Sequence, residues 1–182
     1  MSATAQATPE KPAIRTTAMK IETITISYNR ILQRIYVHSY YTGEARKAGG
    51  VPPNLAATIQ ASDSNRDILT QLIDSSIAET TNTLTRYLGI CTAQHDSEKA
   101  ETALSIEIPE NYPRECLQQI AQTIEEYATM RALGQWLIQN KPDEAVAAVQ
   151  ETQMAAMRLR ELMSLRKRPC KHPGTPDNNI AL

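Results

Sequence analysis

Apolar residues recur at helical spacing through the middle of the chain. Between residues 64 and 88 they follow one another at steps of three and four, which is the spacing of one face of an α-helix. These positions are Ile68, Leu69, Leu72, Ile73, Ile77, Leu84, Tyr87 and Leu88. Ser64 with Asp67 resembles a capping box, and Gly89 stands where a glycine commonly ends a helix. The opposite face is polar, so this helix must pack against partners.

Three further segments show the same spacing. They predict helices over residues 27–48, with Ser27 as the cap, over residues 111–139, and from Pro142 to about residue 165. Prolines and glycines at residues 49–53 end the first of these helices. The two-residue link at 140–141 is so short that the last two helices must form an antiparallel hairpin.

One segment alternates with the period of a strand. Over residues 102–108 the apolar side chains of Leu104, Ile106 and Ile108 alternate with polar ones, which predicts a half-buried strand that Pro109 ends. A strand needs a partner, and within the chain only residues 20–26 are rich enough in β-branched residues to supply one. Otherwise the partner is another copy of the protein or a neighbour. Residues 91–100 are polar and are predicted to form a loop tip.

The composition favours helices packed on helices. The chain has 182 residues, 4% aromatic residues and no Phe, so its core must be built mainly from aliphatic side chains. We predict a mainly α fold: a four-helix bundle-like domain over residues 21–165 with one or two short strands. Residues 1–20 and 166–182 are predicted to be extended arms, because both lack apolar periodicity and contain prolines.

Charge is balanced overall but uneven along the chain. The net charge is -1, yet cations gather near the end of the last helix and in the segment that follows it. They are Arg158, Arg160, Arg166, Lys167, Arg168 and Lys171. The simplest interpretation is a helix end whose dipole favours cations, followed by a solvated tail. The alternative is contact with nucleic acid or with an acidic protein surface.

Four of the seven tyrosines lie in the first predicted helix: Tyr28, Tyr36, Tyr40 and Tyr41. A tyrosine suits the edge of a core, where the ring packs and the hydroxyl remains hydrated. Tyrosine is also enriched at subunit interfaces, which is the alternative for this group. The single tryptophan, Trp136, is interpreted as a core anchor.

No pattern of catalytic or metal-binding residues emerges. The three cysteines include no C-x-x-C pair, and the three histidines are not placed at metal-ligand spacing. The acid pairs at residues 125–126 and 143–144 are assigned to a polar helix flank and to a helix first turn. No nucleotide-binding or hydrolase motif is present. We therefore expect no enzyme activity, no cofactor and no metal. We also expect a soluble protein, because no apolar run is long enough to cross a bilayer.

The order of the predicted elements resembles that of the head–tail connector (adaptor) proteins of tailed bacteriophages. In that family a long helix commonly ends in a Tyr-Leu-Gly string, here TRYLG at residues 85–89, and a later helix follows an x-Pro step. The matching segment here is IPENYPRECLQQIAQTIEEYA at residues 108–128. The resemblance covers about residues 64–165. The linker at residues 49–53 and the two long arms depart from the family pattern.

The resemblance implies a structural role in the virion neck, assembled in the host cytoplasm. Such proteins form a ring, usually of twelve subunits, that docks on the portal protein, contacts other neck or tail ring proteins and extends the DNA channel. It implies that the tail docks on the portal through Arg166, Lys167, Arg168, Pro169, Lys171, Ile180 and Leu182. It also implies that neighbouring subunits pair edges at Leu104, Ile106 and Ile108, and that the channel contacts genomic DNA non-specifically.

Two other functions are open from the residues alone. One is a small helical regulatory or partner-binding protein whose basic tail is the docking segment. The other is a non-specific DNA binder that uses the cations of its C-terminal region, which salt-dependent binding to duplex DNA would reveal.

Overall fold

The computed structural model describes residues 19–89, 91–140 and 142–166, and within them the fold is mainly α-helical with a small sheet, as predicted. The elements, in chain order, are β1 (Met19–Ser27), α1 (Tyr28–Ala48), α2 (Pro53–Ala57), the 3-10 turn η1 (Asp63–Asn65), α3 (Arg66–Leu88), β2 (Cys91–Asp96), β3 (Glu101–Pro109), α4 (Glu115–Asn140) and α5 (Pro142–Ser164). Residues 19–20, assigned above to the N-terminal arm, belong to β1.

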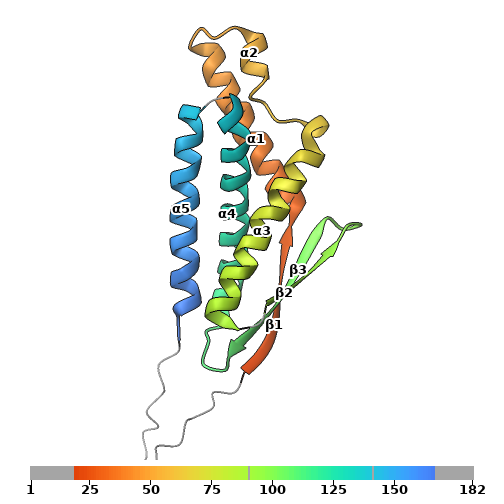
Figure 1. Ribbon diagram of the computed structural model, residues 1–182, viewed down its shortest axis with the longest axis vertical. Helices are drawn as coiled ribbons and strands as arrows, with labels where there is room; N and C mark the ends of the chain where they lie inside the picture. Colours follow the sequence, from red (N-terminus) through yellow and green to blue (C-terminus); the bar gives the residue numbers. More distant parts are fainter. Residues whose placement is uncertain (1–18, 90, 141, 167–182) are drawn as a thin grey trace, which may run out of the picture.

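α4 is the helix around which the other long helices are arranged. α1, α3 and α5 all pack against it, and α5 runs antiparallel to it as expected from the short link (Figure 1). The sheet lies at one end of the helical layer, where β1 contacts α4 and where β2 and β3 contact α3. The core is aliphatic and lies where these helices meet the sheet.

The sheet is antiparallel with the strand order β1-β3-β2. β1 pairs with β3 along its whole length, from Met19 opposite Pro109 to Ser27 opposite Glu101. The alternation predicted for residues 102–108 is present, because every second side chain of β3 is buried against the helices. The expected in-chain partner, residues 20–26, is the strand that pairs with it.

The prediction that residues 102–108 pair with a neighbouring subunit is wrong. β3 is the central strand, so β1 occupies one of its edges and β2 the other. Leu104, Ile106 and Ile108 point into the core of their own chain, where they are almost completely buried. These side chains therefore have no surface to offer to a second copy.

The prediction of a loop over residues 91–100 is also wrong in its first half. Cys91–Asp96 forms β2, and only the residues after it form the turn that leads into β3. β2 has no apolar alternation because most of its side chains are exposed. Its backbone forms a strand because it completes the ladder on the open side of β3. The Asp96 carboxylate accepts hydrogen bonds from the backbone N–H groups of Glu98 and Lys99, which stabilises the turn.

Each end of α3 is defined by a local feature of the chain. The N-terminal turn before α3 is stabilised by Ser62, whose N–H donates to Asn65 Oδ1 at 3.2 Å, rather than by Ser64 and Asp67. Gly89 ends α3 with a φ of 103°, and a Cβ there would lie 3.1 Å from the carbonyl oxygen of Glu107. Glycine is therefore required at this position by both conformation and space.

Two other boundaries depend on tertiary contacts. α4 begins at Glu115 rather than at residue 111, because the N–H of Tyr112 donates to the carbonyl of Pro109 and forms a turn. Trp136 packs against the core, as predicted, and its indole N–H donates to the carbonyl of Ile59 at 2.9 Å. That bond fixes the connector after α2 to α4.

Replacing a core residue of β3 should destabilise the whole domain. We expect Ile106→Ala, at a completely buried position, to lower the free energy of unfolding by about 2–4 kcal/mol in chemical denaturation. The control is Ile21→Ala on the outer face of β1, where the side chain is 70% exposed and the loss should be below about 0.5 kcal/mol. Equal effects of the two substitutions would contradict the assignment of β3 to the core.

Candidate interaction surfaces

The basic cluster predicted at the C-terminal end is only partly within the described residues. Lys167, Arg168, Pro169, Lys171, Ile180 and Leu182 lie outside them, so their predicted docking role stays a prediction. Arg166 folds back on the bundle: its Nη1 donates to the carbonyl of Met163 at 2.9 Å, and its guanidinium lies over the Tyr112 ring. Arg158 pairs with Glu126 on α4 at 3.2 Å. The structure therefore does not bring Arg158 and Arg166 together into one cationic patch.

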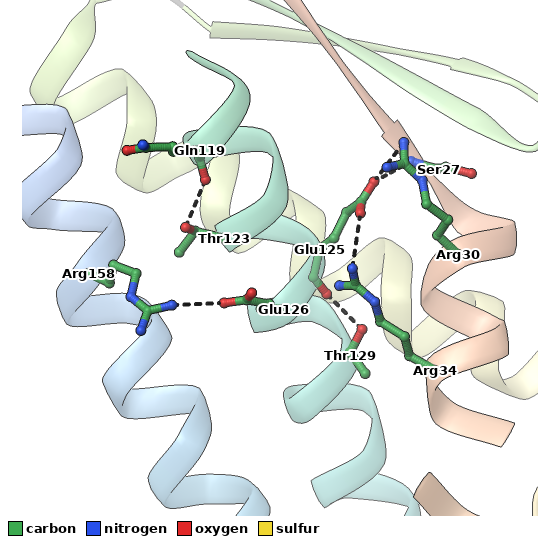
Figure 2. A network of polar contacts seen from close by, with 9 residues as sticks. All are labelled: Ser27, Arg30, Arg34, Gln119, Thr123, Glu125, Glu126, Thr129 and Arg158. Atoms are coloured by element: carbon green, nitrogen blue, oxygen red, sulfur yellow. Dashed lines mark hydrogen bonds and ion pairs between the residues drawn. The ribbon is translucent and has the colours of Figure 1, made fainter. Parts of the chain in front are cut away.

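The acid pair on α4 is split between core and surface. The two side chains point in different directions, Glu126 toward Arg158 and Glu125 toward α1 (Figure 2). Glu126 is half-exposed, whereas the side chain of Glu125 is only 1% exposed. The assignment of both residues to a polar flank is thus wrong for Glu125. The signal was present in the sequence, since Glu125 stands four residues after Ala121 and three before Ala128, within the apolar stripe.

The buried Glu125 carboxylate joins the start of α1 to α4. Its Oε1 accepts a hydrogen bond from the backbone N–H of Ser27 at 3.2 Å and lies 3.3 Å from Arg30 Nη2. Its Oε2 lies 4.0 Å from Arg34 Nη2, as Figure 2 shows. Ser27 thus contributes its backbone here, and its hydroxyl forms no cap on α1. A buried charge requires such partners, because removing a carboxylate from water is costly.

A second polar chain connects α3, α1 and the β2–β3 hairpin. The Tyr28 hydroxyl donates to Asp74 Oδ1 at 2.5 Å and accepts from the Thr102 hydroxyl at 3.3 Å. His95 completes the chain through Nδ1, 3.1 Å from the Thr102 oxygen, and its ring lies 4.9 Å from that of Tyr28. Burial, and then the hydrogen bond to Asp74, raise the pKa of Tyr28 to about 12. The chain holds the hairpin against the helices, and nothing in its position resembles a substrate site.

Exposed apolar side chains occur on all five α-helices, and on α1 and α5 several of them recur at helical spacing along one face. On α1, Val37, Tyr40 and Tyr41 point to solvent, and the two tyrosine rings make an edge contact at 5.9 Å. We call them the α1 face. Tyr28 and Tyr36 belong instead to the core or its edge. Two of the four tyrosines are thus in the core-edge role, and the other two remain candidates for a subunit interface. On α5, the exposed apolar residues Val146, Met154 and Met157 form the α5 face. α1 and α5 lie on different sides of α4 (Figure 1).

A groove lies between α3, α4 and α5. Its volume is about 410 Å³, and it is lined by Thr83 from α3, by Met130 and Ile138 from α4, and by Val149 and Leu159 from α5, among others. The ion pair between Glu79 and Arg131, at 2.8 Å, crosses it from α3 to α4. Volumes of this size are typical of clefts that bury a ligand or a short peptide segment. No local sequence pattern predicts the groove, because it depends on how three helices pack against one another.

The cysteines and acidic residues indicate no further site within the described residues. Cys91 and Cys116 are half-buried free thiols, and burial raises the pKa of Cys91, which disfavours the reactive thiolate. Across residues 19–89, 91–140 and 142–166, no group of three or more His, Cys, Asp or Glu side chains could hold a metal ion. None of the helices in these ranges is long and apolar enough to span a bilayer.

Comparison with protein-family models, with curated proteins and with solved structures gives no match to this chain.

Removing the charge of Glu125 should destabilise the fold. We expect Glu125→Gln to lower the free energy of unfolding by about 1–3 kcal/mol, since Arg30 and Arg34 lose their buried counter-ion. Glu126→Gln, at the adjacent half-exposed position, should cost less than about 1 kcal/mol. Urea denaturation of both variants checks the difference, and equal losses would refute the assigned role of Glu125.

The fold should lose stability at alkaline pH through Tyr28. An unfolded tyrosine ionises near pH 10, at about its reference pKa, whereas in the folded chain the pKa of Tyr28 is about 12. The raised pKa stabilises the folded state by an amount that is fully present below about pH 10 and is lost as the pH rises through about 12. The free energy of unfolding should therefore fall by on the order of 2–3 kcal/mol over this range. We expect Tyr28→Phe to show a smaller loss of stability across this range in denaturant titrations at fixed pH. Near neutral pH, the difference in unfolding free energy between the wild-type and Tyr28→Phe chains measures the lost hydrogen bond alone. If both chains lost the same amount of stability between pH 10 and 12, the prediction would be contradicted.

Proposed function

We propose that this chain is a structural protein of the tailed-bacteriophage neck, a head–tail connector subunit. In this proposal copies of the chain assemble as a ring in the host cytoplasm, dock on the portal and become part of the virion. The ring extends the DNA channel toward the tail and contacts the genomic DNA non-specifically. This proposed role involves no catalysed reaction.

The observation that carries the proposal is the presence of two different exposed apolar surfaces, the α1 face and the α5 face. A ring is closed by heterologous contacts, in which one surface of each subunit meets a different surface of the next. Exposed aromatic and methionine side chains are typical of such contacts, and scattered single apolar residues are not. Tyr40 and Tyr41 lie side by side, as an interface would require.

The order of elements adds support. The Tyr-Leu-Gly string ends α3, as the resemblance to the connector family requires, and Gly89 takes the positive φ that ends the helix. The strand at residues 102–108 offers no edge to a neighbouring subunit, because both of its edges pair within the chain. The contacts between subunits are therefore assigned to the helical faces.

A rival function is a small helical partner-binding protein. The groove between α3, α4 and α5 favours it, because a groove of this size can hold part of a partner. The two functions differ in the assembly they predict: a partner-binding protein gives a complex of defined low mass, and a connector gives a ring.

Assembly of variants altered on one face tests the connector proposal. We expect the full-length chain to form closed rings by native mass spectrometry and electron microscopy, alone or with the portal protein encoded in the same genome. Tyr41→Lys on the α1 face and Met157→Lys on the α5 face, at side chains 68% and 54% exposed, should each abolish ring formation. Loss of a central anchor commonly costs about 2 kcal/mol or more, or roughly thirtyfold in affinity.

Mixing the two variants gives the sharpest result. Each retains one intact face, so an equal mixture should form a heterodimer through the α5 face of the Tyr41→Lys chain and the α1 face of the Met157→Lys chain, and nothing larger. Ile68→Lys, an exposed apolar position on α3 outside both faces, is the control and should still form rings. A wild-type chain that stays monomeric with and without the portal would overturn the proposal.

A further inference from the structure

The groove between α3, α4 and α5 is partly apolar. At one end it is lined by Ile138 and Val149, whose side chains are 59% and 46% exposed. At the other end it is lined by Leu159 and Arg160, in the last two turns of α5. Gly134 lies in its wall on α4 beside Ala148 of α5, and a Cβ there would make an ordinary contact of 3.5 Å with the Cβ of Ala148. Apolar side chains that remain exposed in a concave site are typical of a binding surface.

The chain itself supplies a segment that begins beside this groove. α5 ends at Ser164, about one turn beyond Leu159 and Arg160. Arg166 is held against the same end of the bundle, since its Nη1 donates to the carbonyls of Met163 and Leu165. Arg166, the last residue that the structure describes, therefore lies within about 10 Å of the groove mouth, by the rise of about 1.5 Å per helical residue.

The length of that segment is sufficient to reach the far end of the groove. From Leu159 to Val149 the groove follows α5 for roughly 15 Å. Fourteen extended residues, from 167 to Ile180, span up to about 45 Å, so a reversal of direction and a return along α5 fit within this reach.

The composition of residues 167–182 changes from polar at its start to apolar at its end, and this apolar end matches the apolar far end of the groove. Residues 167–179 are polar, cationic or proline, whereas Ile180, Ala181 and Leu182 are apolar. Prolines at 169, 173 and 176 favour an extended backbone, and Gly174 permits a turn. An extended polar stretch would thus cross the mouth of the groove, and the apolar residues would arrive where Ile138 and Val149 are exposed.

We propose that residues 167–182 fold back along α5 and seat Ile180 and Leu182 in the groove of their own chain. Binding within one chain is favoured because the short connection keeps the segment at a high effective concentration near its site. The contact is a latch: it covers the groove until a partner takes either the segment or the groove. It does not rest on the proposed connector function.

Hydrogen exchange on the full-length chain tests the latch. We expect backbone amides of residues 177–182 to exchange at least about tenfold more slowly in the wild-type chain than in Val149→Arg, because a docked apolar segment protects its amides. Val146→Arg is the matched control, since Val146 has the same side chain on the same helix, is 56% exposed and lies outside the groove. It should leave the exchange of residues 177–182 at the wild-type rate.

A peptide experiment provides a second measurement. All buried core residues lie between Ile24 and Met163, so a chain that ends at Arg166 retains its core, and circular dichroism checks that it folds. A fluorescent peptide of residues 167–182 should bind this shortened chain at least about tenfold more tightly than it binds the full-length chain, whose own segment competes. The same peptide with Ile180→Asp and Leu182→Asp should not bind.

Three results would overturn the latch. One is equal exchange in the wild-type and Val149→Arg chains. Another is equal peptide binding to the shortened and full-length chains. The third is protection that increases with protein concentration, which would place the segment in another copy. Ring formation is tested separately: Val146→Arg alters the α5 face and should impair rings while the latch persists, so the two proposals fail independently.

Discussion

The pairing of β1 with β3 is the constraint on which the rest of the structure depends. It joins residues about 80 positions apart in the chain, and it places Tyr28, the first residue of α1, beside the turn before β3, where its N–H donates to the carbonyl of Ala100 at 2.9 Å. With β3 in the centre, its buried side chains face the core and α3 packs against it, while α4 contacts β1 beside it. β2 then occupies the other edge of β3, so β3 itself has no edge left to pair with a second copy.

Glu125 shows how this pairing is coupled to the helices. The N–H of Ser27, the last residue of β1, donates to its carboxylate, and Arg30 on the next turn of α1 pairs with it. A buried carboxylate contributes little net stability, but leaving its partners unmatched is costly, so it favours one arrangement of α1 against α4 over others. Ile120 and Ile124 contribute apolar packing nearby, whereas Glu125 determines how α1 is placed against α4.

The sequence was sufficient for the elements whose pattern is local. The four long helices, the alternating strand and the role of Gly89 all follow from spacing and from the conformational freedom of glycine. β2 was missed because an exposed edge strand has no apolar alternation, and its conformation depends on the strand beside it. The prediction that Glu125 lies on a polar helix flank was wrong because it followed from the charged side chain, although the position of Glu125 is within the apolar stripe of α4. The groove and the two exposed faces depend on helix packing, which no local pattern records.

The direct passage from β1 into α1 has a mechanical consequence. The last residue of β1 is followed directly by the first residue of α1, so the strand enters the helix without a linker. Tension applied at Met19 along β1 would load the ladder with β3 in shear, with many hydrogen bonds sharing the force at once.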